Sequence, residues 1–327
     1  MVEHKIILYL ISLLSGAAGA WACARFGTFA GFVDYPSRRS SHVKPTPKGG
    51  GIGVLVAFII SSIILECHIC FWLPVVFVAI LGLMDDRKGI SPFVRLCLQT
   101  GAAFVMVLAV FSMGSGSFNF CYIIFWVIFI TGTANCYNFM DGINGIAGLT
   151  ASALFFLCWL FLRSSGSDTL LSVLVLSLLF ACLGFLPFNF PGAKVFMGDC
   201  GSLMIGFLFG GIVLISVNSI NDFFLYIAFL FPFYADAVTT MVIRIKKREN
   251  LFKAHRSHLY QILVNEAGFS HFVVALLYFV VQMITGIGVL YFYQQHAYRV
   301  FLPVGLSFAG FAFFSGMVRY RVAKWQV

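Results

Sequence analysis

The sequence predicts an all-α membrane protein that crosses the bilayer about 11 times. The composition is the first reason, because 61% of the 327 residues are hydrophobic and only 10% are charged, a balance unlike that of soluble globular domains. The second reason is the succession of apolar runs, most of them close to the roughly 20 residues that cross a bilayer core as a helix. The predicted spans are 6–24, 50–65, 70–84, 95–113, 120–137, 145–162, 169–187, 202–218, 222–243, 271–293 and 299–318.

The distribution of Lys and Arg predicts the orientation of these spans. With the N-terminus outside, the inner loops and the C-terminus collect 18 of the 21 basic residues, and the outer side keeps only Lys5, Arg163 and Arg299. Cytoplasmic loops carry such an excess. We therefore expect one membrane domain, 1–327, with its C-terminus and its functional loops in the cytoplasm. The net charge of +9 fits this topology and attraction to anionic lipids, and no nucleic-acid partner is expected.

The inner loop after the first span is basic and rich in proline, which opposes helix. It ends in Pro47-Lys48-Gly49-Gly50-Gly51. Its cations, Lys48 among them, and its backbone N–H groups suit an anion. A topology signal alone would explain the positive charge of the loop but not this ending.

Asp85 and Asp86 end the span 70–84 and precede Arg87 and Lys88. Two adjacent carboxylates repel each other unless a cation neutralises them, and their oxygens are ligands that suit Mg²⁺. The pair is therefore a candidate metal or phosphate site. The alternative is a charge cluster that fixes the depth of the helix in the membrane.

Asn138, Asp141 and Asn144 follow one another at intervals of three residues. On a helix they form a polar stripe, and Gly142 and Gly145 would let a ligand approach the backbone closely. A helix end followed by a turn is the alternative interpretation. Three polar residues in register at a membrane interface favour a functional site.

The stretch from Asn189 to Ser202 combines an amide, a cation, an aromatic ring and a carboxylate before a helix. Phe196 could stack on a base, Asp199 could hold a metal ion, and Ser202 could cap the helix, whose N-terminus attracts phosphate. An ordinary capped loop is the alternative.

Two further groups belong to the inner end of the span 222–243 and the loop after it. Asp236 lies deep in the span, so it should face a cavity or a partner, with an ion pair to Arg or Lys as the alternative. His255, Arg256 and His258 suit phosphate binding or proton transfer. Zinc is less expected, because no partner Cys is nearby. His271 is expected to be interfacial or structural, and so is His42 apart from its place in the basic first inner loop.

Taken in order, these motifs resemble the glycosyl transferase 4 family of polyprenyl-phosphate N-acetylhexosamine-1-phosphate transferases. The resemblance runs from Asp34 to His258. It consists of the Pro47-Lys48-Gly49-Gly50 loop, Asp85-Asp86, Asn138-x-x-Asp141-Gly142, Asn189 ten residues before Asp199, Phe196-Met-Gly-Asp199-x-Gly-Ser, Asp236 and the histidine loop.

The resemblance implies transfer of a sugar-1-phosphate from a UDP-N-acetyl sugar to undecaprenyl phosphate, with release of UMP, in the bacterial inner membrane. The N-terminus would then be periplasmic. Asp199, with Asp86 as a second candidate, should ligate Mg²⁺, with Mn²⁺ as an alternative ion. Asp85 and Asp86 should serve the lipid phosphate or its deprotonation. The remaining assignments are Asn189 and Phe196 to uracil, with Asp141 and Gly142 nearby, and Lys48, His255, Arg256 and His258 to phosphates. A homodimer is a further expectation.

Two departures from the family pattern bear on the donor. Asn144 stands where many members carry Asp, and the histidine loop is His255-Arg256-Ser257-His258 rather than His-x-His-His. This form resembles the O-antigen-initiating branch, which uses 6-deoxy-N-acetylhexosamines, so the expected sugar is FucNAc or QuiNAc, otherwise GlcNAc. A teichoic-acid or peptidoglycan-type transferase is the alternative within the family.

Two rival classes fit the sequence less well. Transporters place charged residues near the midplane, whereas these spans are nearly free of charge apart from Asp236. An intramembrane aspartyl protease would leave the loop around Asp199 without a role.

Overall fold

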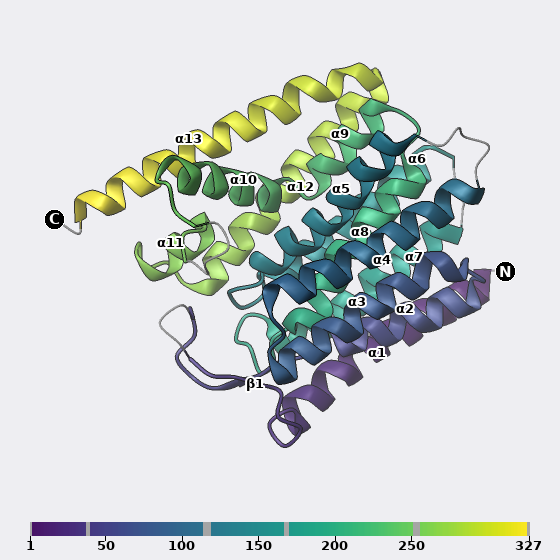
Figure 1. The fold of residues 1–327 in the computed structure, drawn as a ribbon, viewed down its shortest axis with the longest axis horizontal. Helices are drawn as coiled ribbons and strands as arrows, with labels where there is room; N and C mark the ends of the chain where they lie inside the picture. Colours follow the sequence, from purple (N-terminus) through teal and green to yellow (C-terminus); the bar gives the residue numbers. More distant parts are fainter. Residues whose placement is uncertain (1, 37–39, 114–118, 167–169, 251–255, 326–327) are drawn as a thin grey trace.

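The computed structural model describes residues 2–36, 40–113, 119–166, 170–250 and 256–325. Its helices form one bundle, with loops and two short strands at its ends (Figure 1). The elements are α1 (Val2–Phe26), β1 (Val33–Asp34), β2 (Thr46–Pro47), α2 (Ile52–Ile64), α3 (Ile69–Lys88), α4 (Pro92–Met113), α5 (Phe120–Phe139), α6 (Ile146–Ser164), α7 (Leu170–Asn189), α8 (Gly198–Ser216), α9 (Ile220–Phe229), α10 (Phe231–Lys246), α11 (Leu259–Asn265), α12 (His271–Gln295), the 3₁₀ turn η1 (Ala297–Val300) and α13 (Phe301–Trp325).

The all-α polytopic architecture predicted from the sequence is confirmed. Within the described ranges, nine helices are long and apolar enough to cross a membrane, and the bent pair α9–α10 raises the number to ten. The remaining predicted span, 50–65, corresponds to α2, which has only 13 residues. A helix of that length spans roughly 20 Å, less than a bilayer core. Which membrane face each end meets stays a prediction.

The predicted span 222–243 is broken rather than straight. The axes of α9 and α10 differ by 88°, with Leu230 between them. Pro232 is the second residue of α10, a position where its ring favours the start of a helix. Because proline has no N–H to donate back to α9, it also opposes a continuous helix through this point. The hydropathy of the segment gave no sign of the bend.

The helix α8 lies at the centre of the bundle. In its apolar stretch 83% of the residues are buried, compared with 17% for α13 at the edge. It packs against α3 and α5. At Gly206 the backbones of α8 and α5 come so close that a Cβ on Gly206 would lie 2.7 Å from the carbonyl oxygen of Thr133. The helix α8 is therefore packed tightly within the bundle, and its first turn carries Asp199.

Two loops join at the end of the bundle where α3, α5 and α7 finish and α8 begins. The strands β1 and β2 pair antiparallel, with Val33 opposite Pro47. The loop continues against the segment before α8, because Phe196 N donates to Pro47 O at 2.8 Å and Gly50 N donates to Phe196 O at 2.9 Å. These backbone bonds bring Lys48 and Phe196 to the same place.

Candidate active site

Asp199 is the second residue of α8 and is held by side chains from two other helices. Its Oδ1 accepts a hydrogen bond from Asn138 Nδ2 at 2.8 Å, and its Oδ2 accepts one from Arg95 Nη1 at 2.9 Å. Asn138 Nδ2 also donates to Ser202 Oγ at 2.9 Å, and that hydroxyl donates to the Gly198 carbonyl at 3.0 Å. Ser202 thus bonds back within the first turn, and the prediction that it caps α8 is wrong.

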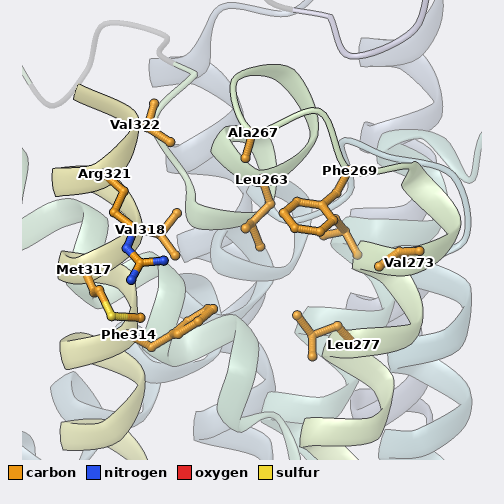
Figure 2. Close-up of a pocket in the computed structure, with 11 residues that line it drawn as sticks. Leu263, Ala267, Phe269, Val273, Leu277, Phe314, Met317, Val318, Arg321 and Val322 are labelled. Atoms are coloured by element: carbon orange, nitrogen blue, oxygen red, sulfur yellow. The ribbon is translucent and has the colours of Figure 1, made fainter. Parts of the chain in front are cut away.

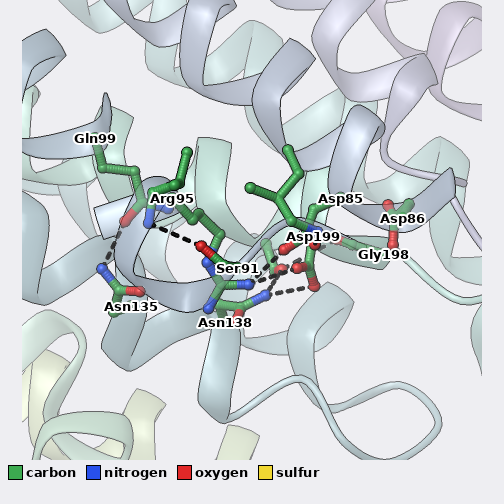
Figure 3. A network of polar contacts seen from close by, with 12 residues as sticks. Asp85, Asp86, Ser91, Arg95, Gln99, Asn135, Asn138, Gly198 and Asp199 are labelled. Carbon is green, nitrogen blue, oxygen red and sulfur yellow. Dashed lines mark hydrogen bonds and ion pairs between the residues drawn. The ribbon is translucent and has the colours of Figure 1, made fainter. Parts of the chain in front are cut away.

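Arg95, on α4, connects two of the carboxylates (Figure 3). The same Nη1 atom donates to Asp85 Oδ2 at 2.7 Å and to Asp199 Oδ2. Asp85 Oδ1 accepts the backbone N–H of Ile90 at 2.6 Å. Charge-assisted bonds of this kind are among the stronger ones in proteins. One guanidinium therefore fixes the relative positions of the last turn of α3 and the first turn of α8.

Asp86 points to the other side, toward the first inner loop. Its Oδ1 lies 3.4 Å from Lys48 Nζ, and its Oδ2 accepts the backbone N–H of Cys200 at 3.3 Å. Gly198 allows this approach, because it has a φ of 76° and a Cβ there would lie 2.5 Å from Asp86 Oδ2. The three carboxylates thus meet two cations, Arg95 and Lys48.

A polar cavity of about 360 Å³ opens over this cluster, within the range of small-molecule sites. It contains seven of the residues predicted from the sequence: Lys48, Asp86, Asn138, Asp141, Gly142, Phe196 and Asp199. Its other walls are Asp34, Ser40, Ser41, His42, Ile143, Gly198 and Gln261. Residues that are far apart in the chain therefore share one space at the end of the bundle.

Asn189 and Asn144 do not line this cavity. The amide of Asn189 is buried, with Nδ2 donating to Val195 O at 2.9 Å and Oδ1 accepting from Gly145 N at 2.8 Å. Both ends of the amide are thus engaged with backbone, and the predicted contact with uracil is not the arrangement found here. The backbone N–H of Asn144 donates to His271 Nδ1 at 3.3 Å.

Part of the histidine loop lies within the described residues. His255 lies outside them, and Arg256 and His258 are not among the cavity walls. His258 directly precedes α11, and its Nδ1 lies 3.5 Å from Asp236 Oδ1. Asp236 also accepts bonds from Leu259 N at 2.8 Å and Tyr278 Oη at 2.7 Å. The predicted partner of Asp236 is therefore present, but it is a histidine with backbone and tyrosine groups rather than Arg or Lys.

Comparison with known proteins identifies the segment that carries the carboxylates. A model of glycosyl transferase family 4 matches residues 68–217. This range includes Asp85, Asp86, Asn138, Asp141 and Asp199. This segment of the chain is similar to glycosyl transferase family 4.

Curated relatives match this protein over most of both chains. A probable undecaprenyl-phosphate N-acetylglucosaminyl 1-phosphate transferase of Bacillus subtilis is 29% identical over 285 residues, 81% of this chain and 78% of the relative. A decaprenyl-phosphate N-acetylglucosaminephosphotransferase of Mycobacterium leprae is 29% identical over 318 residues, 83% and 80% of the two chains. A phospho-N-acetylmuramoyl-pentapeptide-transferase of Staphylococcus aureus is 27% identical over 280 residues, 76% and 85%.

The sequence interpretation missed several residues of the site. Arg95 was assigned to topology, which explains a basic residue at the inner end of a span without any further role. His42 was expected to be structural, yet it lines the cavity, with its ring centroid 4.9 Å from that of Phe196. Gln261 belongs to no recognisable sequence motif. It reaches the cavity only because α11 folds against it.

The electrostatics of the cavity act on Asp141, which lies in the loop between α5 and α6. Burial raises the pKa of this carboxyl to about 8, and the negative charges of Asp199, Asp86 and Asp34 add to the shift. A bound cation would oppose the contribution of these neighbours. The pKa of Asp141 therefore depends on the total charge of the neighbouring carboxylates and of any bound cation.

The residues present fit a hard cation held together with substrate. Within the described residues no three His, Cys, Asp or Glu side chains form a ready metal cage. Mg²⁺ in phosphate-handling sites usually takes one or two carboxylates and completes its shell with water and phosphate oxygens. Asp199 and Asp86 supply such a pair of side chains on the wall of one cavity.

Proposed function

We propose that this protein transfers an N-acetylhexosamine-1-phosphate from a UDP-sugar to undecaprenyl phosphate and releases UMP. The proposal rests mainly on one observation. Asp86, Asp199 and Lys48 line the same cavity at the end of a bundle of apolar helices. The names of the relatives, which include polyprenyl-phosphate N-acetylglucosamine-1-phosphate transferases, support the same reaction class.

The arrangement suits phosphoryl transfer, which depends mostly on positioning and charge neutralisation. Lys48 is placed to bind a phosphate group of the donor, and Phe196 offers a ring for stacking on the base. Asp199 and Asp86 would hold Mg²⁺, which supplies neutralisation of the pyrophosphate charge when bound. Asp85, or Asp86 where it is free of metal, would accept the proton of the lipid phosphate.

Arg95 is a positioning residue in this proposal. Its bonds keep Asp85 and Asp199 at a fixed separation. Its Nε, and Nε2 of the neighbouring Gln99, are buried with no hydrogen-bond partner among the described residues. Buried donors of this kind are usually satisfied in the working protein, here by water or by an oxygen of an entering phosphate.

The donor sugar and the biological setting are finer parts of the proposal. The His255-Arg256-Ser257-His258 sequence favours a 6-deoxy sugar such as FucNAc or QuiNAc, otherwise GlcNAc, and initiation of O-antigen synthesis at the inner membrane. The lysine and arginine distribution favours a cytoplasmic cavity, where UDP-sugars are made. A peptidoglycan-type or teichoic-acid-type donor is the second candidate, since a pentapeptide-transferase is among the relatives.

The test is product analysis. Purified protein is incubated with Mg²⁺, undecaprenyl phosphate and a panel of UDP-N-acetyl sugars, and the released nucleotide is identified. Release of UMP together with a lipid that carries a pyrophosphate-linked sugar is the expected result. Release of UDP would contradict the reaction class, and turnover of UDP-GlcNAc without UDP-FucNAc or UDP-QuiNAc would contradict the 6-deoxy assignment alone.

A further inference from the structure

A second cavity, of about 250 Å³, lies on the opposite face of α11 from the polar one. Leu263 of α11 lines it, whereas Gln261 of the same helix lines the polar cavity. Residues two apart on a helix point to nearly opposite sides. The second cavity is therefore a separate space, which α11, the start of α12 and the last turns of α13 enclose (Figure 2).

The walls of this second cavity are apolar except at one point. Leu263 is buried, while Phe269, Leu277 and Phe314 remain 50%, 41% and 39% exposed. Partly exposed apolar walls at the edge of a membrane bundle face lipid rather than water. The volume is below the roughly 300–1,000 Å³ of sites for drug-sized ligands, so it suits a single hydrocarbon chain better than a ring system.

Arg321 is the one charged residue in the lining, and it differs from the neighbouring cations of α13. Figure 2 shows its guanidinium on the α13 side of the cavity, beside Val318, Met317 and Phe314. Arg319 donates to Ser315 Oγ and Thr240 Oγ1, both at 3.1 Å, and Lys324 Nζ lies 4.9 Å from the centroid of the Tyr320 ring. Within the part of the chain that the structure describes, Arg321 has no hydrogen bond or ion pair. Arg321 is exposed and stands at the rim of the cavity, where its guanidinium can bind an anion.

The position of Arg321 indicates where that anion comes from. It lies four residues before the end of α13 at Trp325, at the same end of the bundle as the polar cavity. A long basic side chain near the end of a span reaches the level of the lipid headgroups. An anionic headgroup next to an apolar chain matches both parts of the cavity.

We propose that this second cavity binds one acyl chain of an anionic glycerophospholipid, with the headgroup phosphate on Arg321. The bound chain would pack against Leu263 and so support α11, whose other face contributes Gln261 to the polar cavity. This lipid is neither the acceptor nor a reactant, because the catalytic carboxylates lie beyond α11.

The test compares lipids that differ only in headgroup charge. Delipidated protein is titrated with phosphatidylglycerol and with phosphatidylcholine of the same acyl chains, and bound lipid is counted by native mass spectrometry beside the thermal midpoint. We expect phosphatidylglycerol to bind at least tenfold more tightly and to raise the midpoint. Arg321→Gln should remove most of this preference, and Leu277→Trp, which fills the cavity, should remove binding of the retained lipid.

Lys324→Gln is the matched control, because Lys324 is a cation on the same helix that does not line the cavity. It should keep the preference. Equal loss in Lys324→Gln and Arg321→Gln would overturn the proposal in favour of general attraction to a basic surface. Equal binding of the two lipids by the unmodified protein, or displacement of phosphatidylglycerol by undecaprenyl phosphate at the same site, would also overturn it.

Discussion

Arg95 shows how a single side chain can organise the carboxylates of this protein. Its Nη1 contacts Asp85 and Asp199, which come from helices that are not adjacent in the sequence. The sequence motifs pointed to the two carboxylates but not to the guanidinium between them. The reason is that a basic residue in an inner loop or at a helix start is expected from topology alone, so its charge carried no signal of function.

We expect Arg95→Gln to lower turnover by tenfold or more, because two charge-assisted hydrogen bonds, each contributing roughly 1.5–3 kcal/mol, are lost together. Arg95→Lys keeps the charge and should restore part of the rate. The rates are measured as UMP release at saturating donor, with the thermal midpoint measured in parallel. Wild-type turnover in Arg95→Gln would show that the bridge has no part in positioning.

The raised pKa of Asp141 makes the stability of the folded protein depend on pH. Its pKa is raised from 3.8 to about 8 in the folded protein. A carboxyl with a raised folded-state pKa favours folding while it stays protonated, so this contribution is full below about pH 4 and is lost as the pH rises through about 8. The stability of the metal-free protein should therefore fall relative to that of Asp141→Asn across this window.

The measurement is the thermal midpoint of both proteins with chelator, at several values from about pH 5 to about pH 8.5. Subtracting the two curves removes the contributions of groups that are the same in both proteins. Parallel curves would show that Asp141 keeps an ordinary pKa. Added Mg²⁺ should reduce the difference, since it neutralises the carboxylates next to Asp141.

At the scale of the elements, the sequence predicted the helices well and their irregularities poorly. Hydropathy placed every long span, because apolar length is set directly by the thickness of the bilayer. The break between α9 and α10 depends on Pro232 and on the contacts of α10, and the role of Asn189 depends on two loops meeting. Such features arise from contacts between segments that are distant in the sequence, and the hydropathy pattern of one segment cannot predict them.

The short helix α11 tests how the inner loops are held. Asp236 accepts bonds from Leu259 N, Tyr260 N, Tyr278 Oη and Thr240 Oγ1. Asp236→Asn replaces one accepting oxygen by an amide N–H₂ group, which cannot accept these hydrogen bonds. A buried group left without its partner costs about 1–3 kcal/mol. We expect a lower thermal midpoint. We also expect a higher KM for the UDP-sugar, because a displaced α11 would move Gln261, which lines the polar cavity.

Glu249→Gln is the comparison for Asp236→Asn, since the Glu249 side chain is 43% exposed and its buried partner Arg244 keeps a hydrogen bond to Asn250 O at 2.6 Å. Its midpoint and KM should therefore change less than those of Asp236→Asn. A similar small effect in Asp236→Asn would mean that α11 is held by its apolar contacts alone.

For the whole molecule, the bundle explains why the site stands where it does. Spans that alternate in direction bring the ends of α3, α5 and α7 and the start of α8 to one side, so carboxylates from distant motifs share a cavity at one end of the bundle. A water-soluble nucleotide sugar and a lipid phosphate can meet only at a boundary between membrane and water. Seven predicted residues line this cavity. Those that do not, such as Asn189 and His258, instead hold the surrounding loops.

The central claim is that the cavity around Asp199 performs metal-dependent phospho-sugar transfer. Its most direct test is UMP release by Asp199→Asn, compared with the wild type and with Glu66→Gln, an exposed carboxylate in the loop at the opposite end of the bundle. We expect Asp199→Asn to lose Mg²⁺-dependent release by at least a hundredfold, about 2.7 kcal/mol in the barrier, while it stays folded and Glu66→Gln stays active. Near-normal Mg²⁺-dependent release by Asp199→Asn would contradict the claim.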